Sequence, residues 1–264
     1  MKLTVLCDNS TRVDAYYLAE PGVSYYLEDG DQRILFDTGY SDVYVKNAQA
    51  LGIDLSQVTM VVLSHGHNDH TGGLAHFPAE GIPLVAHPEV FGAKEYEGEK
   101  IGSPLTQQQA GERFRLQLSR EPVALTERLT FLGEIPRLHD FEGRRPIGRR
   151  LVENGWEADL LPDDTALAYR GEEGLWIITG CSHAGICNIV EHAKKVCGEE
   201  RICGIVGGFH LMEADLQTEE TIRHLKRLRP RYMRPCHCTC FAARAAIHQQ
   251  LPVQDTCVGD VLEL

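Results

Sequence analysis

Three histidines and one aspartate fall within six consecutive residues in the first third of the chain. They are His65, His67, Asp69 and His70, in the stretch SHGHNDH. Residues two apart in an extended segment point the same way, so the imidazoles of His65 and His67 can bind one metal ion while Asp69 and His70 turn to a second. Imidazole and carboxylate suit zinc, and also iron or manganese. The spacing predicts a metal centre, the alternative being surface histidines in a polar loop.

We expect a buried strand to precede this cluster and to position it. Residues 58–63 form a short apolar run rich in β-branched side chains, which predicts a buried strand leading directly into the motif. Upstream, residues 23–28 and 33–36 flank the pair Asp29-Gly30 and predict a hairpin. Residues 41–51, between the hairpin and the buried strand, predict a helix closed by Gly52.

The second half of the chain alternates strands and helices again. The pattern predicts a hairpin at 166–169 and 175–179, a strand at 202–206, and helices at 186–196, 218–228 and 241–251. The middle, from about 89 to 150, is less regular, with a helix predicted at 106–119 and short strands near Val123 and Thr130. We therefore expect an α/β fold of layered sheets covered by helices, in a single domain over 1–264 with an irregular insert at about 89–150.

Composition and charge argue against several classes of protein, such as nucleic-acid-binding and membrane-spanning proteins. The 264 residues include 26 Lys+Arg and 38 Asp+Glu, a net charge of −12, which disfavours non-specific binding to nucleic acid or anionic membrane. An anionic substrate in a locally positive site is still compatible with that balance. No apolar run approaches the roughly 18 residues needed to span a bilayer, and no apolar leader follows Met1. With an odd number of cysteines, nine, we expect a cytoplasmic protein with reduced thiols.

The metal motif and its surroundings resemble the metallo-β-lactamase-fold superfamily. Residues 34–39 (ILFDTG) resemble its first motif, in which an aspartate, here Asp37, orients the metal loop, and residues 59–65 resemble the strand before the metal motif. The later stretches DDTAL (163–167), TGCSHAGICN (179–188), GGFHL (207–211) and HCT (237–239) follow in order. That series is similar to the 7,8-dihydropterin-6-methyl-4-(β-D-ribofuranosyl)aminobenzene-5′-phosphate synthase-like subfamily, and only about 90–150 carries little of the likeness.

The resemblance implies a four-layer αββα sandwich with two divalent metal ions, bridged by a hydroxide, at the edge between the sheets. Zinc is the first expectation for these ions, and iron or manganese are the alternatives. The implied ligands are His65, His67, Asp69, His70, His183 and His237. His210 would lie close to the metals as a ligand or a proton-transfer group, the alternative being a buried polar residue behind the ligands. We expect Asp69 and His210 to be catalytic.

Two positions depart from the family's pattern. Cys181 stands where many members carry a bridging aspartate, so this thiolate or Asp164 would take that place, unless Cys181 is simply a buried polar residue. Cys240 stands where the family has glycine, two residues after Cys238 and four after Cys236. Cysteines at alternate positions can form a separate metal site or favour iron, and they can also be small, buried, reduced side chains.

The subfamily name implies that a dihydropterin-methyl group is joined to an aminobenzene ribosyl phosphate with loss of pyrophosphate. We therefore expect a dinuclear metal-dependent enzyme that uses a metal-bound hydroxide or a metal-held diphosphate on a small phosphorylated or pterin-like substrate. Arg144 and Arg145, near Arg149 and Arg150, can grip a phosphate or form a solvated basic loop. The alternatives are a generic hydrolase, such as a lactonase or phosphodiesterase, and a redox- or ligand-sensing protein on the same fold. Neither nucleic acid nor a membrane is an expected partner, and the sequence carries no sign of an oligomeric state.

Overall fold

The computed structural model describes all residues from 1 to 264 and divides them into two compact units. The first unit consists of residues 1–120, 146–159 and 256–264, and the second of residues 121–145 and 160–255. Each unit has its own main sheet and its own helices, so each is described separately. The expectation of a single domain stays a prediction.

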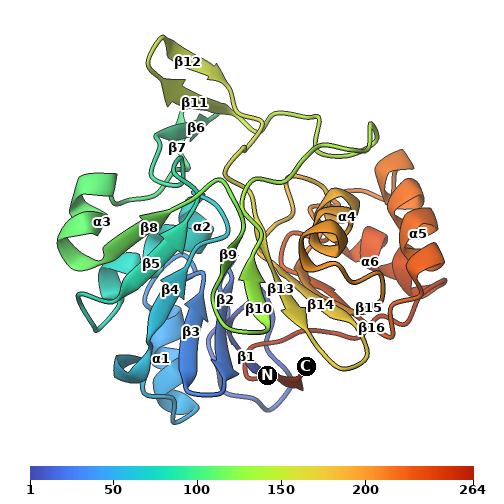
Figure 1. The fold of residues 1–264 in the computed structure, drawn as a ribbon, viewed down its shortest axis with the longest axis horizontal. Helices are drawn as coiled ribbons and strands as arrows, with labels where there is room; N and C mark the ends of the chain where they lie inside the picture. The colour runs from blue at the N-terminus through green and yellow to red at the C-terminus, as the bar shows by residue number, and fades with distance from the viewer. The chain divides into compact units, whose positions relative to one another are not determined.

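The first unit is built on a seven-stranded sheet (Figure 1). Its order is β17 (Val261–Glu263), β1 (Lys2–Cys7), β2 (Ser24–Asp29), β3 (Gln32–Phe36), β4 (Met60–Val62), β5 (Pro83–Ala86) and β8 (Arg115–Leu118). The predicted hairpin is confirmed as β2 and β3, and β3, β4, β5 and β8 run parallel. Because parallel strands end at one edge of a sheet, the residues after β3 and β4 lie side by side there. Asp37 follows β3, and the metal motif follows β4.

Three α-helices belong to the first unit: α1 (Val43–Ala50), α2 (Asn68–Thr71) and α3 (Gln107–Arg113). Helix α1 packs on the sheet through Tyr44 and Ala48, which share a buried cluster with Leu6 and Val61. The helix predicted at 106–119 is wrong in its second half. It begins after a Thr106 capping box and ends at Arg113 because residues 115–118 (RLQL) alternate in burial and pair with β5 as strand β8.

A small four-stranded sheet lies beside the metal motif in the same unit. Its order is β12 (Gly155–Ala158), β11 (Arg149–Val152), β6 (Lys94–Tyr96) and β7 (Glu99–Lys100). The backbone just after β7 contacts the motif, because Gly102 pairs with His67 and the N–H of Asn68 donates to the Ile101 carbonyl at 2.9 Å. This sheet therefore holds one side of the metal loop in place.

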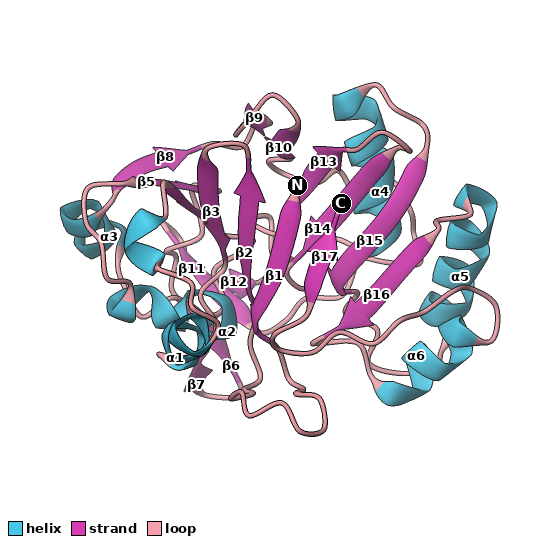
Figure 2. Ribbon diagram, turned by 90° about the horizontal axis from the view of Figure 1, so that it is seen from below, coloured by secondary structure: helices cyan, strands magenta, loops and turns pink.

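The second unit has a six-stranded sheet (Figure 2). Its order is β16 (Tyr232–Cys236), β15 (Ile202–Gly208), β14 (Leu175–Thr179), β13 (Ala166–Arg170), β10 (Leu129–Phe131) and β9 (Val123–Ala124). The predicted hairpin is confirmed as β13 and β14, whereas β14, β15 and β16 are parallel. Three helices cover this sheet: α4 (Ile186–Cys197), α5 (Leu216–Leu228) and α6 (Phe241–His248). All three were predicted, the last one three residues too long.

Neither unit contains a helix that is both long and apolar enough to cross a membrane.

Candidate metal centre

The metal motif forms a tight loop between β4 and α2 in the first unit. His67 has an extended backbone (φ −70°, ψ 149°) and precedes the first turn of α2, which carries Asp69 and His70. His65 Nε2 lies 3.1 Å from His67 Nδ1, and both rings are largely buried. Two imidazole nitrogens bound to one zinc ion at ~2.05 Å in tetrahedral geometry would be about 3.3 Å apart. The observed separation therefore fits two ligands of one metal ion.

Asp37 holds this loop in place through hydrogen bonds. Its backbone lies in the left-handed region (φ 58°), and its side chain is fully buried. Oδ1 accepts from the Ser64 N–H at 2.7 Å, and Oδ2 accepts from Ser64 Oγ and His70 Nδ1, each at 2.7 Å. A carboxylate on Nδ1 fixes the tautomer and orientation of the ring, which leaves His70 Nε2 as the atom available to a metal.

The electrostatic environment of His70 favours positive charge. Burial lowers the pKa of His70, but the carboxylates of Asp69 and Asp37 raise it well above its ordinary value. Asp69 Oδ2 lies 3.5 Å from His70 Nε2. The same negative field that favours an imidazolium also favours a bound cation.

In the second unit, the histidine candidates lie beyond the ends of three adjacent parallel strands. His183 follows β14, His210 follows β15 and His237 follows β16. His210 and His237 have left-handed backbones, with φ of 46° and 49°, and so does Ser182 with 63°. Each such residue other than glycine costs about 1–3 kcal/mol, and strain of this kind concentrates at functional sites. The three turns thus bring polar side chains to one edge of the second sheet.

Hydrogen bonds between these turns fix their positions relative to one another. Ser182 Oγ donates to the Gly208 carbonyl at 2.6 Å, and the Phe209 N–H donates to Thr239 Oγ1 at 3.0 Å. The ring centroids of His183 and His210 lie 4.3 Å apart, with the ring planes tilted by 50°. The result is a group of histidines whose positions depend on one another.

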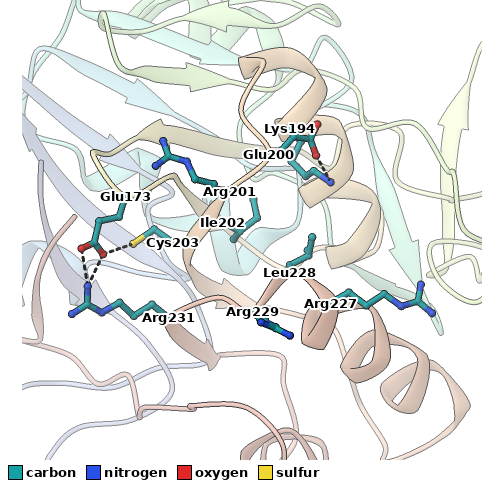
Figure 3. A pocket seen from close by; sticks show the side chains of 10 residues that line it. All are labelled: Glu173, Lys194, Glu200, Arg201, Ile202, Cys203, Arg227, Leu228, Arg229 and Arg231. Carbon is teal, nitrogen blue, oxygen red and sulfur yellow. Dashed lines mark hydrogen bonds and ion pairs between the residues drawn. The ribbon is translucent and has the colours of Figure 1, made fainter.

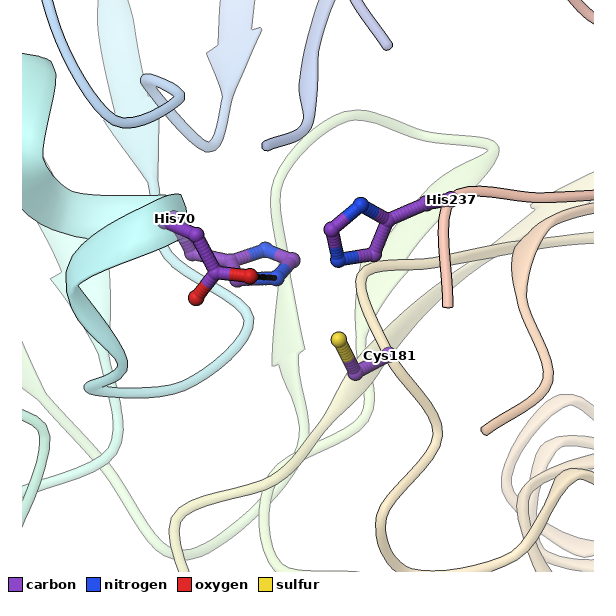
Figure 4. A group of neighbouring side chains, drawn as sticks. His70, Cys181 and His237 are labelled. Atoms are coloured by element: carbon purple, nitrogen blue, oxygen red, sulfur yellow. Dashed lines mark ion pairs between the residues drawn. The ribbon is translucent and has the colours of Figure 1, made fainter. Parts of the chain in front are cut away.

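Cys181 and His237 lie next to each other in this group (Figure 4). The Sγ atom of Cys181 and a ring nitrogen of His237 are within 4.8 Å of one another, a spacing that allows both to bind a metal ion. The Cys238 thiol donates to the Cys181 carbonyl at 3.4 Å. Burial raises the pKa of Cys238, but a hydrogen bond with the Cys181 side chain and the nearby rings of His237 and His210 lower it to about 5.

Comparison with known proteins identifies the family of the chain that carries these potential metal-binding side chains. A sequence model of the metallo-beta-lactamase superfamily matches residues 18–197. The chain belongs to this superfamily. The crystal structure of Tm1679, described as a metal-dependent hydrolase of the beta-lactamase superfamily, superposes with a TM-score of 0.88 at 32% identity, covering 100% of this chain and 99% of that one. YhfI from Bacillus subtilis shares the fold, with a TM-score of 0.60, 14% identity and coverage of 100% and 98%.

Within the superfamily, the chain is similar to a named synthase. The 7,8-dihydropterin-6-methyl-4-(beta-D-ribofuranosyl)-aminobenzene-5'-phosphate synthase of Methanocaldococcus jannaschii is 34% identical over 261 residues, which cover 92% of this chain and 89% of that protein. The expected α/β class and metallo-beta-lactamase fold are therefore confirmed. Metallo-beta-lactamase folds imply divalent metal binding, and the imidazole, carboxylate and thiolate groups described above fit that chemistry.

Asp164, the other bridging candidate, has one carboxylate oxygen bonded to the backbone and one, Oδ1, without a hydrogen-bond partner. Its side chain is fully buried, and Oδ2 accepts from the Ala184 N–H at 2.8 Å. Burial raises its pKa to about 7, against the effect of this backbone hydrogen bond and of Arg137. Asp164 thus supports the turn that carries His183.

The predicted arginines separate into two groups. Arg144 and Arg145 lie on an exposed loop of the second unit, where Arg144 pairs with Asp140 at 3.0 Å. Arg149 and Arg150 are on β11 of the first unit and pair with glutamates, Arg149 with Glu95 at 2.9 Å and Arg150 with Glu89 and Glu157. Of these four arginines, only Arg145 is without an ion pair to a carboxylate.

A basic pocket of the second unit is distinct from the histidine edge (Figure 3). Its volume is 420 Å³, and it opens where β15 and β16 begin, whereas His210 and His237 lie where these strands end. Its lining cations are largely neutralised, since Lys194 pairs with Glu200 and Arg231 with Glu173. The pocket is therefore no part of the metal centre.

Two supporting residues were missed by the sequence analysis. Ser64 connects Asp37 to His65, since its Oγ lies 2.7 Å from Asp37 and 2.9 Å from His65 Nδ1. Glu142 is buried and accepts from the N–H groups of Asn188 at 2.6 Å and Cys187 at 3.3 Å, at the start of α4. Ser64 could have been suspected as a buried hydroxyl between a strand and a ligand, but no local signal marks Glu142.

Proposed function

We propose that this chain is a dinuclear metal-dependent enzyme acting on a small, anionic substrate that is phosphorylated or pterin-like. The proposal is carried by the buried network of Asp37, Ser64, His65 and His70, which orients metal ligands as a working centre requires. It is supported by the similarity to the synthase over most of both chains.

The proposed ligands are His65, His67, Asp69, His70, His183 and His237, and Asp37 supports His70. Two divalent ions, zinc in the first place, would supply Lewis-acid stabilisation of negative charge on a phosphoryl or diphosphate group.

His210 and Asp69 are the proposed proton-transfer groups. The ring of His210 is partly exposed and is held by the left-handed turn after β15 and by the ring of His183. A histidine in such a place can take a proton from an attacking group or give one to a leaving group. Asp69 is a quarter exposed, so its second carboxylate oxygen can orient a substrate proton.

Arg144 and Arg145 are the proposed phosphate contacts. Both are exposed on one loop, and Arg144 donates to the Arg137 carbonyl at 3.3 Å and pairs with Asp140, which is itself fully exposed. An ion pair of this kind contributes little and exchanges readily for a phosphate.

The test is a two-substrate assay. The metal-loaded protein is given a dihydropterin-methyl diphosphate with and without an aminobenzene ribosyl phosphate, and pyrophosphate release is measured. Release that requires both substrates, and that is lost in His67→Ala but not in the control His248→Ala on the exposed end of α6, supports the proposal. Absence of bound metal in the gently purified protein would refute it.

A generic hydrolase is the second candidate. It is favoured by the likeness to Tm1679, whose description names a metal-dependent hydrolase. Under this alternative, the protein cleaves a simple ester, lactone or phosphodiester, and the diphosphate is released without the second substrate.

A further inference from the structure

We infer that Tyr40 and Asn68 form a binding site for the pterin-like part of the substrate. The pair recognises a cyclic amide edge, in which a ring N–H lies next to a ring C=O. This inference rests on the proposed function and deepens it, because it assigns two residues of the first unit to one chemical part of the substrate. Neither residue is among the proposed metal ligands.

Tyr40 and Asn68 lie at the surface of the loops that carry the metal motif. Asn68 stands between His67 and Asp69 at the start of α2, and it is partly exposed, whereas His67 is largely buried. Tyr40 lies in the segment after β3 and is 50% exposed. The two side chains are in contact, since Asn68 Nδ2 donates to the Tyr40 hydroxyl oxygen at 3.3 Å. They therefore form one surface feature next to two proposed ligands.

The backbone of Tyr40 is fixed by its neighbours. Its N–H donates to Glu20 Oε1 at 2.8 Å. A Cβ atom at Gly72 would lie 2.3 Å from the Tyr40 carbonyl oxygen, and one at Gly22 would lie 3.0 Å from the Tyr40 nitrogen, so both glycines pack directly against it. A half-exposed side chain on a fixed backbone loses little freedom when a ligand binds, which favours recognition.

The orientation of the Asn68 amide is decided by the groups around it. The Lys100 carbonyl can only accept a hydrogen bond, so Asn68 Nδ2, at 3.4 Å, has to face it. The same NH2 group uses its second hydrogen on the Tyr40 oxygen. The Asn68 backbone N–H is bonded to the Ile101 carbonyl at 2.9 Å. Because both amide hydrogens are engaged, Asn68 Oδ1 is the atom that can accept from a ligand.

The pair thus offers one donor and one acceptor side by side. The Tyr40 oxygen accepts from Asn68, so its own hydrogen can be donated to a ligand. A cyclic amide fits with two hydrogen bonds, its C=O accepting from Tyr40 and its N–H donating to Asn68. A phosphate offers only acceptors and would face the Asn68 oxygen and the neighbouring carboxylate of Asp69. The site therefore takes the oxo-pyrimidine edge of a pterin and not the anionic part of the substrate.

The experiment measures the binding of 6-hydroxymethylpterin to the zinc-loaded full-length protein by fluorescence anisotropy. The comparison ligand is 6-hydroxymethyl-2,4-diaminopteridine. In this ligand an amino group replaces the ring C=O and the adjacent ring nitrogen carries no hydrogen, so donor and acceptor are exchanged. Wild-type protein is expected to bind the pterin about 10-fold more tightly than the diamino ligand.

Two variants remove one partner each. Tyr40→Phe keeps the ring but loses the donor, so we expect pterin binding about 3- to 10-fold weaker and a smaller preference over the diamino ligand. Asn68→Ala loses the acceptor, with an expected effect of the same size. The matched control is Tyr96→Phe, because Tyr96 belongs to the same unit, is 48% exposed and forms no side-chain hydrogen bond. Metal content and circular dichroism verify that each variant is loaded and folded.

The possible failures are distinguishable. Wild-type protein that binds no pterin or binds both ligands equally overturns the inference, and so does Tyr40→Phe protein that keeps the full preference. A loss in Tyr96→Phe as large as that in Tyr40→Phe overturns it as well. Failure of the proposed function shows separately, as absent metal or absent pyrophosphate release, because the binding assay does not depend on turnover.

Discussion

At Asp37, both carboxylate oxygens are engaged, one by the Ser64 N–H and the other by Ser64 Oγ and His70 Nδ1. An amide offers only one acceptor oxygen, so its NH2 group would face a donor and favour the wrong tautomer of His70. A strained backbone at φ 58° holds the residue in this place. A substitution of Asp37 should therefore lower the affinity of the protein for metal.

We expect Asp37→Asn to lower metal affinity by about 10- to 100-fold, the usual effect of losing a partner of a ligating histidine. Competition with a chromophoric chelator measures this affinity. The control is Asp42→Asn, which changes an exposed carboxylate next to α1 that pairs only with Lys46. Equal affinities of the two variants would show that Asp37 does not orient the ligands.

At the scale of elements, Glu142 connects a loop to the start of α4. Its carboxylate accepts two backbone N–H groups there, yet burial raises its pKa to about 7, more than these hydrogen bonds lower it. Because the pKa is higher in the folded than in the unfolded chain, the native state binds more protons between about pH 4.5 and 7. Stability is therefore highest below this window and falls as the pH rises through it.

We expect the second unit to lose about 3 kcal/mol of unfolding free energy between pH 4.5 and pH values well above 7 through this one group. Glu142→Gln should remove that slope, whatever it does to the overall level. Urea unfolding followed at several pH values measures it. Glu199→Gln is the control, because the pKa of this glutamate is lowered to about 2 by its hydrogen bonds with Arg201, outside the window. A slope unchanged in Glu142→Gln would contradict the assignment.

The glycines after the metal motif allow the backbone to approach residues 38–41. A Cβ atom at Gly73 would lie 2.1 Å from the Thr38 carbonyl oxygen and 2.7 Å from that of Ser41. We expect Gly73→Ala to destabilise the first unit by about 1–3 kcal/mol or more. Gly111→Ala in helix α3 meets only Leu116 at 3.7 Å and should stabilise by about 0.5–1 kcal/mol. The urea midpoint of each variant gives the sign, and a stable Gly73→Ala would show that the loop can move away.

Most elements were predictable because their signals are local. The β2–β3 hairpin follows from Asp29-Gly30 between β-forming residues, and α4 from its apolar periodicity. Strand β8 was not predictable in this way. The segment RLQL becomes a strand because β5 offers a free edge with which it can pair, and a single sequence does not display that partner.

At the scale of the molecule, each unit contains one of the two tryptophans. Trp156 is on β12 of the first unit and lies 4.9 Å from the Arg149 guanidinium. Trp176 is on β14 of the second unit and stacks on Tyr232 at 5.2 Å. Single-tryptophan variants can therefore report the unfolding of each unit separately.

We expect metal to stabilise the folded chain, because the proposed ligands are brought together only on folding. At a metal concentration 100 times the dissociation constant, the gain is about 2.7 kcal/mol. Thermal unfolding of Trp156→Phe and Trp176→Phe, with zinc and with a chelator, measures the gain for each unit. His67→Ala serves as the control that should not respond. If metal shifts only one of the two transitions, the ligands belong to that unit alone.

The sequence by itself determined the metal motif, the strand before it and most of the secondary structure. These features depend on spacings of a few residues. In a strand or helix such a spacing fixes the direction in which each side chain points. The tertiary structure alone decided that Asp37 and Ser64 form hydrogen bonds with each other and with His70 and His65. It also decided that Asp164 supports the His183 turn. Likewise, only the tertiary structure shows that Arg149 and Arg150 of β11 form ion pairs with glutamates. These relations join residues far apart in the chain, and only the packing of strands and turns brings such residues together.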